Sequence, residues 1–388
     1  MKIEKNISSN TMTVKLEGRL DTNTVQDLEN EVSNYEGIDS IIFDFENLEY
    51  ISSSGLRFIL KCKKTVENTK VINCSSEVFE IFNITGFSEM MEVEKALRKI
   101  SIDGCEKIGE GFFGIIYRLD PETIVKVYKV KESLEMIQRE ISLAKKAFVM
   151  GIPTAIPYDI VKVGDTYGAV FELLNAKSLV KLINNEDDLD NFAKNCTNIL
   201  KDMHSKEIKE GELPSRKQTV LKTLEDCKKE LSEDTYSKLK KLLEAIPESN
   251  HLLHCDFHVK NIMMQNDELI LIDMDTLSVG NPIFEFASIY STYVGYSCID
   301  KENTDKFLGM PLSVTSKLFD KIFRYYYSDK TDEELQDILT KISVITYLQV
   351  LRLRTVYTDK TCLYPEKERE FCKNFLNEQV NKLDTLLY

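Results

Sequence analysis

The chain of 388 residues is too long for one ordinary domain, and at ~150 residues per domain we expect two or three units. Its formal net charge of −14 argues against a general nucleic-acid binder, because neutralising phosphates requires surplus Lys and Arg. The nine cysteines form no CxxC pair, no apolar signal segment is visible, and no run of roughly 18 apolar residues exists. We therefore expect a cytoplasmic protein with reduced thiols and no membrane span.

Residues 1–97 alternate the apolar patterns of strands and of amphipathic helices, which predicts a small α/β domain. Strands are expected at 11–18, 40–46 and 70–75, and helices at 24–32, 54–64 and 76–87. We expect Ser76 to cap the last of these helices and Gly86 to end it.

From residue 98 the pattern changes and predicts a second, bilobal α+β domain over 98–388. Its β-rich N-lobe (98–174) contains antiparallel strands and one helix over 131–151. Its C-lobe (175–388) is expected to be mostly helical, with a loop-and-strand block at 250–282.

Three glycines, Gly109, Gly111 and Gly114, form a G-x-G-x-x-G pattern in the N-lobe. The pattern by itself is weak, because dinucleotide-binding folds and simple turns also carry it. The dinucleotide alternative requires a helix after the glycines, whereas strand residues follow here. A glycine-rich hairpin over phosphates therefore fits better.

Lys126 lies inside the apolar strand segment TIVKVY. It either extends to solvent from an edge strand or contacts the α- and β-phosphates of a nucleotide. Glu140 and Glu135, on the following helix, are both candidates for its ion-pair partner.

The segment HLLHCDFHVKNIMMQNDELILIDMD (251–275) carries the strongest chemical signal. Phosphoryl transfer needs one carboxylate that orients the attacking hydroxyl, and a second carboxylate with an amide that hold Mg²⁺. Asp256, Asn261 and Asp273 supply this set, and the alternative is a polar loop with buried caps. Together with the glycines, lysine and glutamate, these residues follow the order found in kinases.

The segments HCDFHVKNIMM, LILIDMD and GNPIFEFA resemble the aminoglycoside phosphotransferase and choline-kinase-like group, a branch of the protein-kinase-like fold. The resemblance covers residues 100–388 and implies ATP and Mg²⁺ as cofactors. It implies that Asp256 is the catalytic aspartate, that Asn261 and Asp273 bind Mg²⁺, that His258 lies beside the phosphate or metal, and that His254 braces the loop.

The same resemblance places the hinge at AVFELL (169–174), where backbone groups near Glu172 and Leu174 would bind adenine. His204, in LKDMHS, matches a helix-end motif of the group, although a core or capping histidine is an equal alternative.

This sequence departs from the family motifs at several positions near the site, including Val259 and Lys260 where a proline is common and Met274 where an aromatic residue is frequent. Cys255 replaces the glycine of H-G-D, and Asn281 and Glu285 replace the aspartates of G-D-P-x-x-D. None of these changes removes a catalytic role, so we expect an active enzyme that phosphorylates a hydroxyl of a small molecule or a protein.

Residues 286–388 are expected to supply the acceptor pocket. The tyrosine-rich segments 288–296 and 324–329 would form either an aromatic cage for a quaternary amine or part of the core. The acidic segment 329–337 would either attract a polycation or form a solvated helix face.

The first block also resembles a known family. The segments LEGRLD (16–21), IIFDFEN (41–47) and ISSSGL (51–56) are similar to the STAS domain of bacterial anti-sigma-factor antagonists. The resemblance aligns Ser53 with the serine that is phosphorylated in that family, and Ser52 with its usual aspartate. A serine at this place either caps the helix or accepts a phosphate that the helix dipole favours.

Two function hypotheses follow. In the first, the protein is an ATP-dependent phosphotransferase whose STAS domain regulates it or docks a signalling partner, with Ser53 of the same or another chain as an alternative acceptor. In the second, it is a nucleotide-binding pseudokinase that acts as a signalling module.

Overall fold

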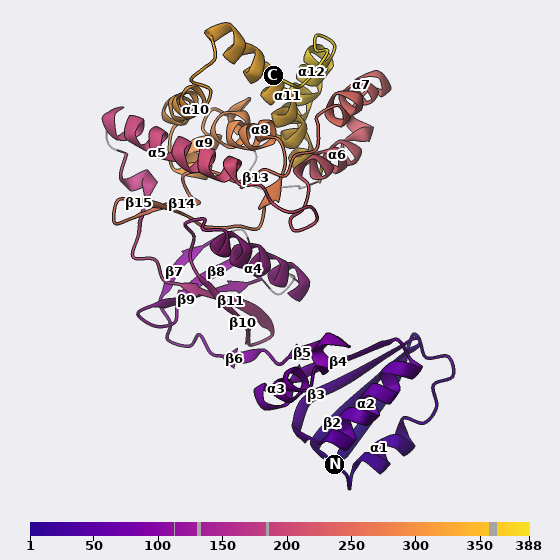
Figure 1. Cartoon of the computed structure of the whole chain (residues 1–388). Coiled ribbons are helices and arrows are strands. Elements are labelled where there is room, and N and C mark those ends of the chain that lie inside the picture. The colour runs from indigo at the N-terminus through magenta and orange to yellow at the C-terminus, as the bar shows by residue number, and fades with distance from the viewer. Residues whose placement is uncertain (112, 130–132, 184–185, 357–362) are drawn as a thin grey trace. The chain divides into compact units, whose positions relative to one another are not determined.

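The computed structural model describes residues 1–111, 113–129, 133–183, 186–356 and 363–388. The chain divides into two compact units. One contains Met1–Ser101 and Ile160–Asp165, and the other contains Ile102–Asp159 and Thr166–Tyr388. Figure 1 labels the helices and strands of both units.

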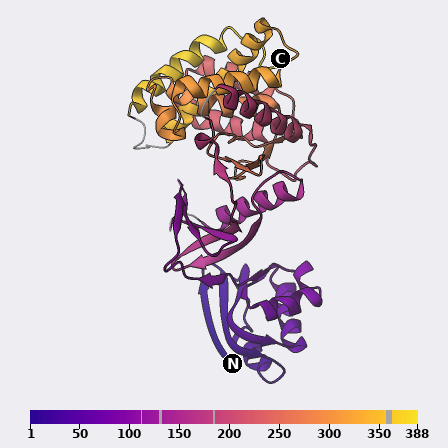
Figure 2. The same cartoon turned by 90° about the vertical axis from the view of Figure 1, so that its left-hand side faces the viewer.

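The first unit is a five-stranded sheet whose helices lie on one face (Figure 2). The strand order is β1-β2-β3-β4-β5, with β1 antiparallel to β2 and the other neighbours parallel. Alternation along β2 buries Met12, Val14 and Leu16 against the helices and exposes Lys15 on the other face. The elements are β1 (Lys2–Ser8), β2 (Thr11–Leu20), α1 (Val25–Glu31), β3 (Ser40–Ile51), α2 (Ser53–Thr65), β4 (Asn68–Cys74), α3 (Ser76–Ile84) and β5 (Val93–Lys95).

The start of α3 differs from the sequence-based expectation by one residue. Ser75, not Ser76, is the N-cap, and its hydroxyl accepts a hydrogen bond from the N–H of Val78 at 3.2 Å. Ser76 is already the first helical residue, so its side chain cannot take the capping position. Gly86 follows the helix with a φ of +75°, which ends the helix as expected.

A six-stranded sheet with one helix forms the β-rich part of the kinase-like region. Its strand order is β6-β10-β11-β9-β8-β7, and a strand, not a helix, follows the glycine loop. That topology excludes the dinucleotide-binding alternative. The elements are β6 (Arg98–Ile100), β7 (Lys107–Glu110), β8 (Gly114–Arg118), β9 (Thr123–Tyr128), α4 (Leu134–Val149), β10 (Pro157–Val163) and β11 (Thr166–Glu172).

The remainder of the second unit is mainly helical, and short strand pairs flank the loop at 254–261 (Figure 1). A large apolar core joins these helices, with α11 packed against α6, α8 and α12. The elements are β12 (Lys177–Ser178), α5 (Glu186–Ser205), α6 (Arg216–Asp226), α7 (Glu233–Glu244), β13 (Leu252–Leu253), β14 (Ile262–Gln265), β15 (Glu268–Leu271), β16 (Ser278–Val279), α8 (Pro282–Tyr293), α9 (Asn303–Leu308), α10 (Leu312–Tyr326), α11 (Asp332–Val356) and α12 (Pro365–Val380). None of the helices in the described part of the chain combines the length and apolar character needed to cross a bilayer.

Candidate active site

Asp256 lies in the loop between β13 and β14, where two neighbouring side chains orient its carboxylate. Its Oδ2 atom accepts a hydrogen bond from Asn261 Nδ2 at 2.7 Å, and its Oδ1 atom lies 3.3 Å from His258 Nε2. Burial would raise the pKa of Asp256, but the hydrogen bond and charge of His258, with His254 and Asn261, outweigh burial and lower it. The half-buried carboxylate is therefore ionised and fixed in direction at neutral pH.

His254 and Glu285 stabilise this loop by hydrogen bonds to its backbone N–H groups. His254 Nδ1 accepts a hydrogen bond from the N–H of Asp256 at 3.2 Å. Glu285, fully buried on α8, accepts hydrogen bonds from the N–H groups of His254 at 2.6 Å and Cys255 at 3.0 Å. His204 Nε2 lies 3.7 Å from the same carboxylate, so this histidine belongs to the support of the loop.

The role of Glu285 was not recognised in the sequence, where it appeared as a departure from a family aspartate. The available signal was a charged residue between Phe284 and Phe286 in an otherwise apolar helix. Burial would raise the pKa of Glu285, but the imidazole of His204, whose Nε2 atom lies 3.7 Å away, and the charge of His254 lower it. The buried carboxylate is thus kept in the charged form that accepts the two backbone bonds.

Cys255 occupies a backbone conformation that explains why glycine is usual at this motif position. Its φ is +62°, in the left-handed region, where a side chain costs roughly 1 kcal/mol or more. Its Sγ atom accepts a hydrogen bond from Ser278 Oγ at 3.6 Å, and burial raises the pKa of the thiol to about 12. The thiol is protonated at neutral pH, which is typical of a buried spacer and not of a reactive cysteine.

Asp273 has the features of a carboxylate shaped for a ligand. Its φ is +65°, and its buried Oδ1 atom has no hydrogen-bond partner among the described residues. Because Asn261 donates through Nδ2 to Asp256, its Oδ1 atom is the one left to bind a cation. Oxygen atoms of a carboxylate and an amide fit Mg²⁺.

Within the described ranges, no three His, Cys, Asp or Glu side chains gather closely enough to hold a metal ion by themselves.

Lys126 forms an ion pair with Glu140 on α4, and the Nζ–Oε1 distance is 2.6 Å. Their side chains are 16% and 12% exposed, so the pair is shielded from solvent. Glu135 is exposed in the first turn of α4, so the structure decides between the two candidates. Burial would lower the pKa of Lys126, but the charges of Asp273 and Glu140 outweigh burial and raise it.

The glycine pattern forms the hairpin between β7 and β8, whose described turn residues include a bond from Gly111 N–H to the carbonyl of Gly114 at 2.8 Å. A Cβ atom on Gly114 would lie 2.3 Å from the carbonyl oxygen of Val127, so only glycine fits there. At Gly109 and Gly111 an added Cβ would meet ordinary contacts, so these two positions are not sterically restricted to glycine.

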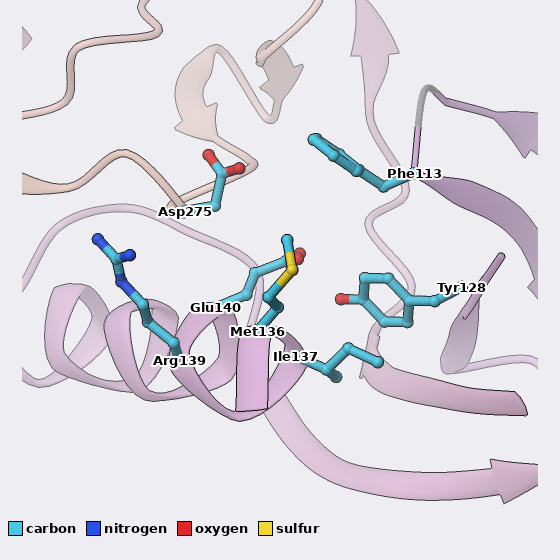
Figure 3. Close-up of a pocket in the computed structure, with 7 residues that line it drawn as sticks. All are labelled: Phe113, Tyr128, Met136, Ile137, Arg139, Glu140 and Asp275. Carbon is cyan, nitrogen blue, oxygen red and sulfur yellow. The ribbon is translucent and has the colours of Figure 1, made fainter. Parts of the chain in front are cut away.

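A cavity lies between this hairpin and α4 (Figure 3). Phe113 extends over it from the hairpin, while the carboxylates of Glu140 and Asp275 lie on its helix and loop sides. Asp275 is not among the site residues predicted from the sequence. Burial and the charges of Asp273 and Glu140 raise the pKa of Asp275 to about 7, which shows that negative charge accumulates here.

The predicted hinge, residues 169–174, covers the last part of β11 and the two residues after it. The N–H of Glu172 donates to the carbonyl of Ile156 at 3.0 Å, and the N–H of Leu173 donates to Glu122 at 2.7 Å. Among the described residues the N–H of Leu174 has no such partner. Leu174 is therefore the residue of the predicted hinge whose backbone N–H remains unpaired within the described part of the chain.

The first unit presents the three serines at the start of α2. Ser52 is the N-cap, and its hydroxyl accepts a bond from Gly55 N–H at 3.4 Å. Ser54 Oγ lies 3.2 Å from Thr22 Oγ1, while Ser53 is exposed at the first helical position. The cap is thus supplied by Ser52, and the hydroxyl of Ser53 is left at the surface.

Comparison with solved structures places the second unit among kinase-like folds. A thermostable mutant of aminoglycoside phosphotransferase APH(4)-Ia is 12% identical over 72% of this chain and 97% of its own, with a TM-score of 0.50. The ADP-bound aminoglycoside phosphotransferase APH(2'')-Ib is 17% identical over 79% of this chain and 99% of its own, with a TM-score of 0.49. A choline/ethanolamine kinase family protein from Mesorhizobium loti is 11% identical over 71% of this chain and 91% of its own, with a TM-score of 0.47.

Family models match both parts of the chain. The STAS domain model matches residues 2–100, and the phosphotransferase enzyme family model matches residues 109–308. The second match covers just over half of the chain and includes the glycine hairpin, Lys126 and the loop of Asp256. The chain therefore belongs to the phosphotransferase enzyme family and carries a STAS domain in front of its kinase-like fold.

Proposed function

We propose that this protein is an ATP- and Mg²⁺-dependent phosphotransferase that transfers the γ-phosphate of ATP to a hydroxyl of a small molecule. The observation that carries the proposal is the ionised Asp256, oriented by Asn261 and His258 in a loop that Glu285 holds. An ionised, fixed carboxylate is what a kinase needs to orient the attacking hydroxyl and to accept its proton.

The remaining groups have roles in binding the nucleotide. Lys126, held by Glu140, supplies a charge for the phosphates, and the backbone at Gly111 and Gly114 in the hairpin covers them. Asp273 and Asn261 would hold Mg²⁺, which neutralises phosphate charge when bound. Leu174 N–H would bind the adenine.

Substituting Asp273→Asn tests the metal role, with Asp267→Asn as a matched control. Both aspartates have a left-handed φ, +65° and +64°, but Asp267 is exposed in the turn between β14 and β15. Calorimetric titration with ATP should show Mg²⁺-enhanced binding in the control and its loss in Asp273→Asn, because the charged metal ligand is gone. Unchanged Mg²⁺ dependence in Asp273→Asn would contradict the assignment.

The pseudokinase alternative predicts a different result for Asp256→Ala. The enzyme proposal requires that acceptor-dependent and basal ATP turnover both fall in this variant, with binding of Mg²⁺–ATP retained. If every measurable ATP turnover is the same as in the wild type, the protein is not an enzyme of this class.

A second candidate acceptor is Ser53, since its hydroxyl is exposed and is not needed for the cap. A phosphate there would lie at the N-terminus of α2, where the helix dipole and Arg57 one turn later stabilise negative charge. Incubation with labelled ATP and Mg²⁺ followed by phosphosite mapping tests it, with Ser53→Ala and Asp256→Ala as controls. Unmodified Ser53 in a protein with an active Asp256 rules out self-phosphorylation.

A further inference from the structure

A second cavity lies beside Asp256, within the helical part of the second unit. It is bounded by the loop of Cys255 and Asp256 and by α6, α8 and α11, which lie side by side (Figure 1). We call it the Asp256 cavity. Because an acceptor hydroxyl must reach Asp256, this cavity is the place where the rest of the acceptor molecule would lie.

The polar groups of the Asp256 cavity are mainly hydrogen-bond donors. Its charged and amide side chains are those of Arg216, Gln349, Arg352 and Asp256. The described lining thus contains two arginines against a single carboxylate, and that carboxylate is the catalytic one. Hydroxyl groups of Ser288 and other residues on α6 and α8 complete the polar surface.

Arg216 is the group whose hydrogen-bonding capacity is least used. Its Nη2 atom donates to Ser288 Oγ at 3.0 Å, but its Nε atom is buried without a hydrogen-bond partner among the described residues. Within the described ranges no carboxylate lies at salt-bridge distance from it. Arg352 differs, because its Nε atom donates to Asp226 at 2.6 Å.

Gln349 adds a second buried donor. Its Nε2 atom also lacks a hydrogen-bond partner within the described part of the chain. A buried donor without a partner is unfavourable, and a guanidinium fork matches the two oxygens of a carboxylate or phosphate. The side chains of Arg216, Gln349 and Arg352 line the Asp256 cavity, and the two guanidinium charges among them favour an anion there.

The other acceptor classes considered for this chain find less support in the structure. The ring of Tyr326 lies 4.7 Å and that of Tyr327 lies 5.2 Å from Phe286, so these tyrosines pack in the core. Tyr296 is the single aromatic residue in the described lining of the Asp256 cavity, and one ring does not form a cage. The acidic residues 332–334 are exposed at the start of α11, as in a solvated helix face. A polyamine acceptor in the cavity would find no carboxylate among its described lining residues other than Asp256.

We infer that the acceptor is a small hydroxylated anion, whose carboxylate or phosphate group is bound by Arg216 and Gln349 while its hydroxyl faces Asp256. This inference rests on the proposed function and specifies its substrate class. The acceptor oxygen forms a bond to the γ-phosphorus of ATP, the bond from that phosphorus to the β–γ bridging oxygen breaks, and ADP leaves. The hydroxyl proton passes to the carboxylate of Asp256 and then to solvent.

Matched acceptors that differ in charge test the inference in full-length protein. Glucuronate, glucose and glucosamine provide an anionic, a neutral and a cationic sugar with the same six-membered ring. Glycerate and glycerol 3-phosphate, compared with glycerol, distinguish a carboxylate from a phosphate. With ADP release as the assay, at least one anion should exceed its neutral counterpart in kcat/KM by about tenfold or more, equivalent to about 1.4 kcal/mol.

Arg216→Gln should raise the KM for that anion by about tenfold or more and leave the KM for ATP unchanged, because it removes the charged fork. Arg216→Lys should recover part of the loss through its charge. Arg324→Gln is the control, since Arg324 is exposed on α10 and pairs with Asp320 and Asp332. Calorimetric titration of the same anions into the protein measures binding apart from turnover.

The inference is overturned if glucosamine or a neutral acceptor is preferred, or if no anion of the panel binds. It is also overturned if Arg216→Gln binds the preferred anion as tightly as the wild type does. Failure of the proposed function gives a different pattern, in which Mg²⁺–ATP neither binds nor turns over while Arg216-dependent anion binding persists.

Discussion

The support of the catalytic loop by Glu285 leads to the prediction that Glu285→Gln destabilises this loop. The glutamate is fully buried and accepts bonds from the N–H groups of His254 and Cys255. Glutamine keeps the size of the side chain but replaces one carboxylate oxygen by an NH₂ group, which cannot accept a bond from a backbone N–H.

The magnitude follows from the two bonds. A hydrogen bond to a charged group contributes about 1.5–3 kcal/mol and a neutral one about 1 kcal/mol, so two bonds lose about 1–4 kcal/mol when the charge is removed. A backbone N–H left without a partner adds to this loss. We expect the opening free energy of the loop to fall by about 3 kcal/mol, and kcat to fall because Asp256 is no longer held in place.

Hydrogen exchange is the suitable assay, because it reads the two amides directly and does not require that both units unfold together. Exchange of the amides of His254 and Cys255 should accelerate by about 100-fold in Glu285→Gln, the equivalent of about 3 kcal/mol. Glu244→Gln, an exposed change on α7, should leave it unchanged. If both amides exchange in Glu285→Gln at the same rate as in the wild type, the reasoning is refuted.

The same prediction has a pH dependence. Because the pKa of Glu285 is lowered in the folded protein, its stabilising effect is present above the unfolded pKa of about 4.3 and is lost as the pH falls through the folded value. The difference in the opening free energy of the loop between the wild type and Glu285→Gln should therefore be largest at pH 7 and should become smaller as the pH falls. A difference that grows in acid would contradict this sign.

Three further substitutions or reactions test other parts of the site. Gly114→Ala should destabilise the hairpin by about 1–3 kcal/mol and weaken ATP binding, because its Cβ would clash with the carbonyl of Val127; wild-type ATP binding by this variant in calorimetry would contradict the close approach. Lys126→Ala should raise the KM for ATP and lower turnover, since a shielded charge is lost from the phosphate site, and steady-state kinetics with an unchanged KM and kcat would argue against that role. Cys255 should resist thiol reagents at pH 8 in the native protein, because the pKa of its thiol is about 12, and mass spectrometry of the modified peptides would reveal any rapid labelling.

The amino-acid sequence alone was enough to predict the two-part architecture and to select the residues that we propose for catalysis. The apolar periods of residues 1–97 and the strand residues after Gly114 are local signals, because the backbone period decides which side chains face the core. The order from the glycines through Lys126 to Asp256, Asn261 and Asp273 is likewise a linear pattern. The predicted N-cap of α3, Ser76, is one residue too late, because the neighbouring Ser75 gives the same local signal and is the actual cap.

The tertiary structure decided how the site is held together and what its acceptor side presents. Glu140 and Glu135 lie on the same helix, and only the packing of α4 against the sheet shows which one reaches Lys126. The sequence predicts an acceptor pocket from residues 286–388; the Asp256 cavity is lined in part by this segment and in part by Arg216 of α6, seventy-two positions before its partner Ser288. Contacts across such separations leave no periodic pattern in the chain, so the charge of the Asp256 cavity became visible only once the helices were packed.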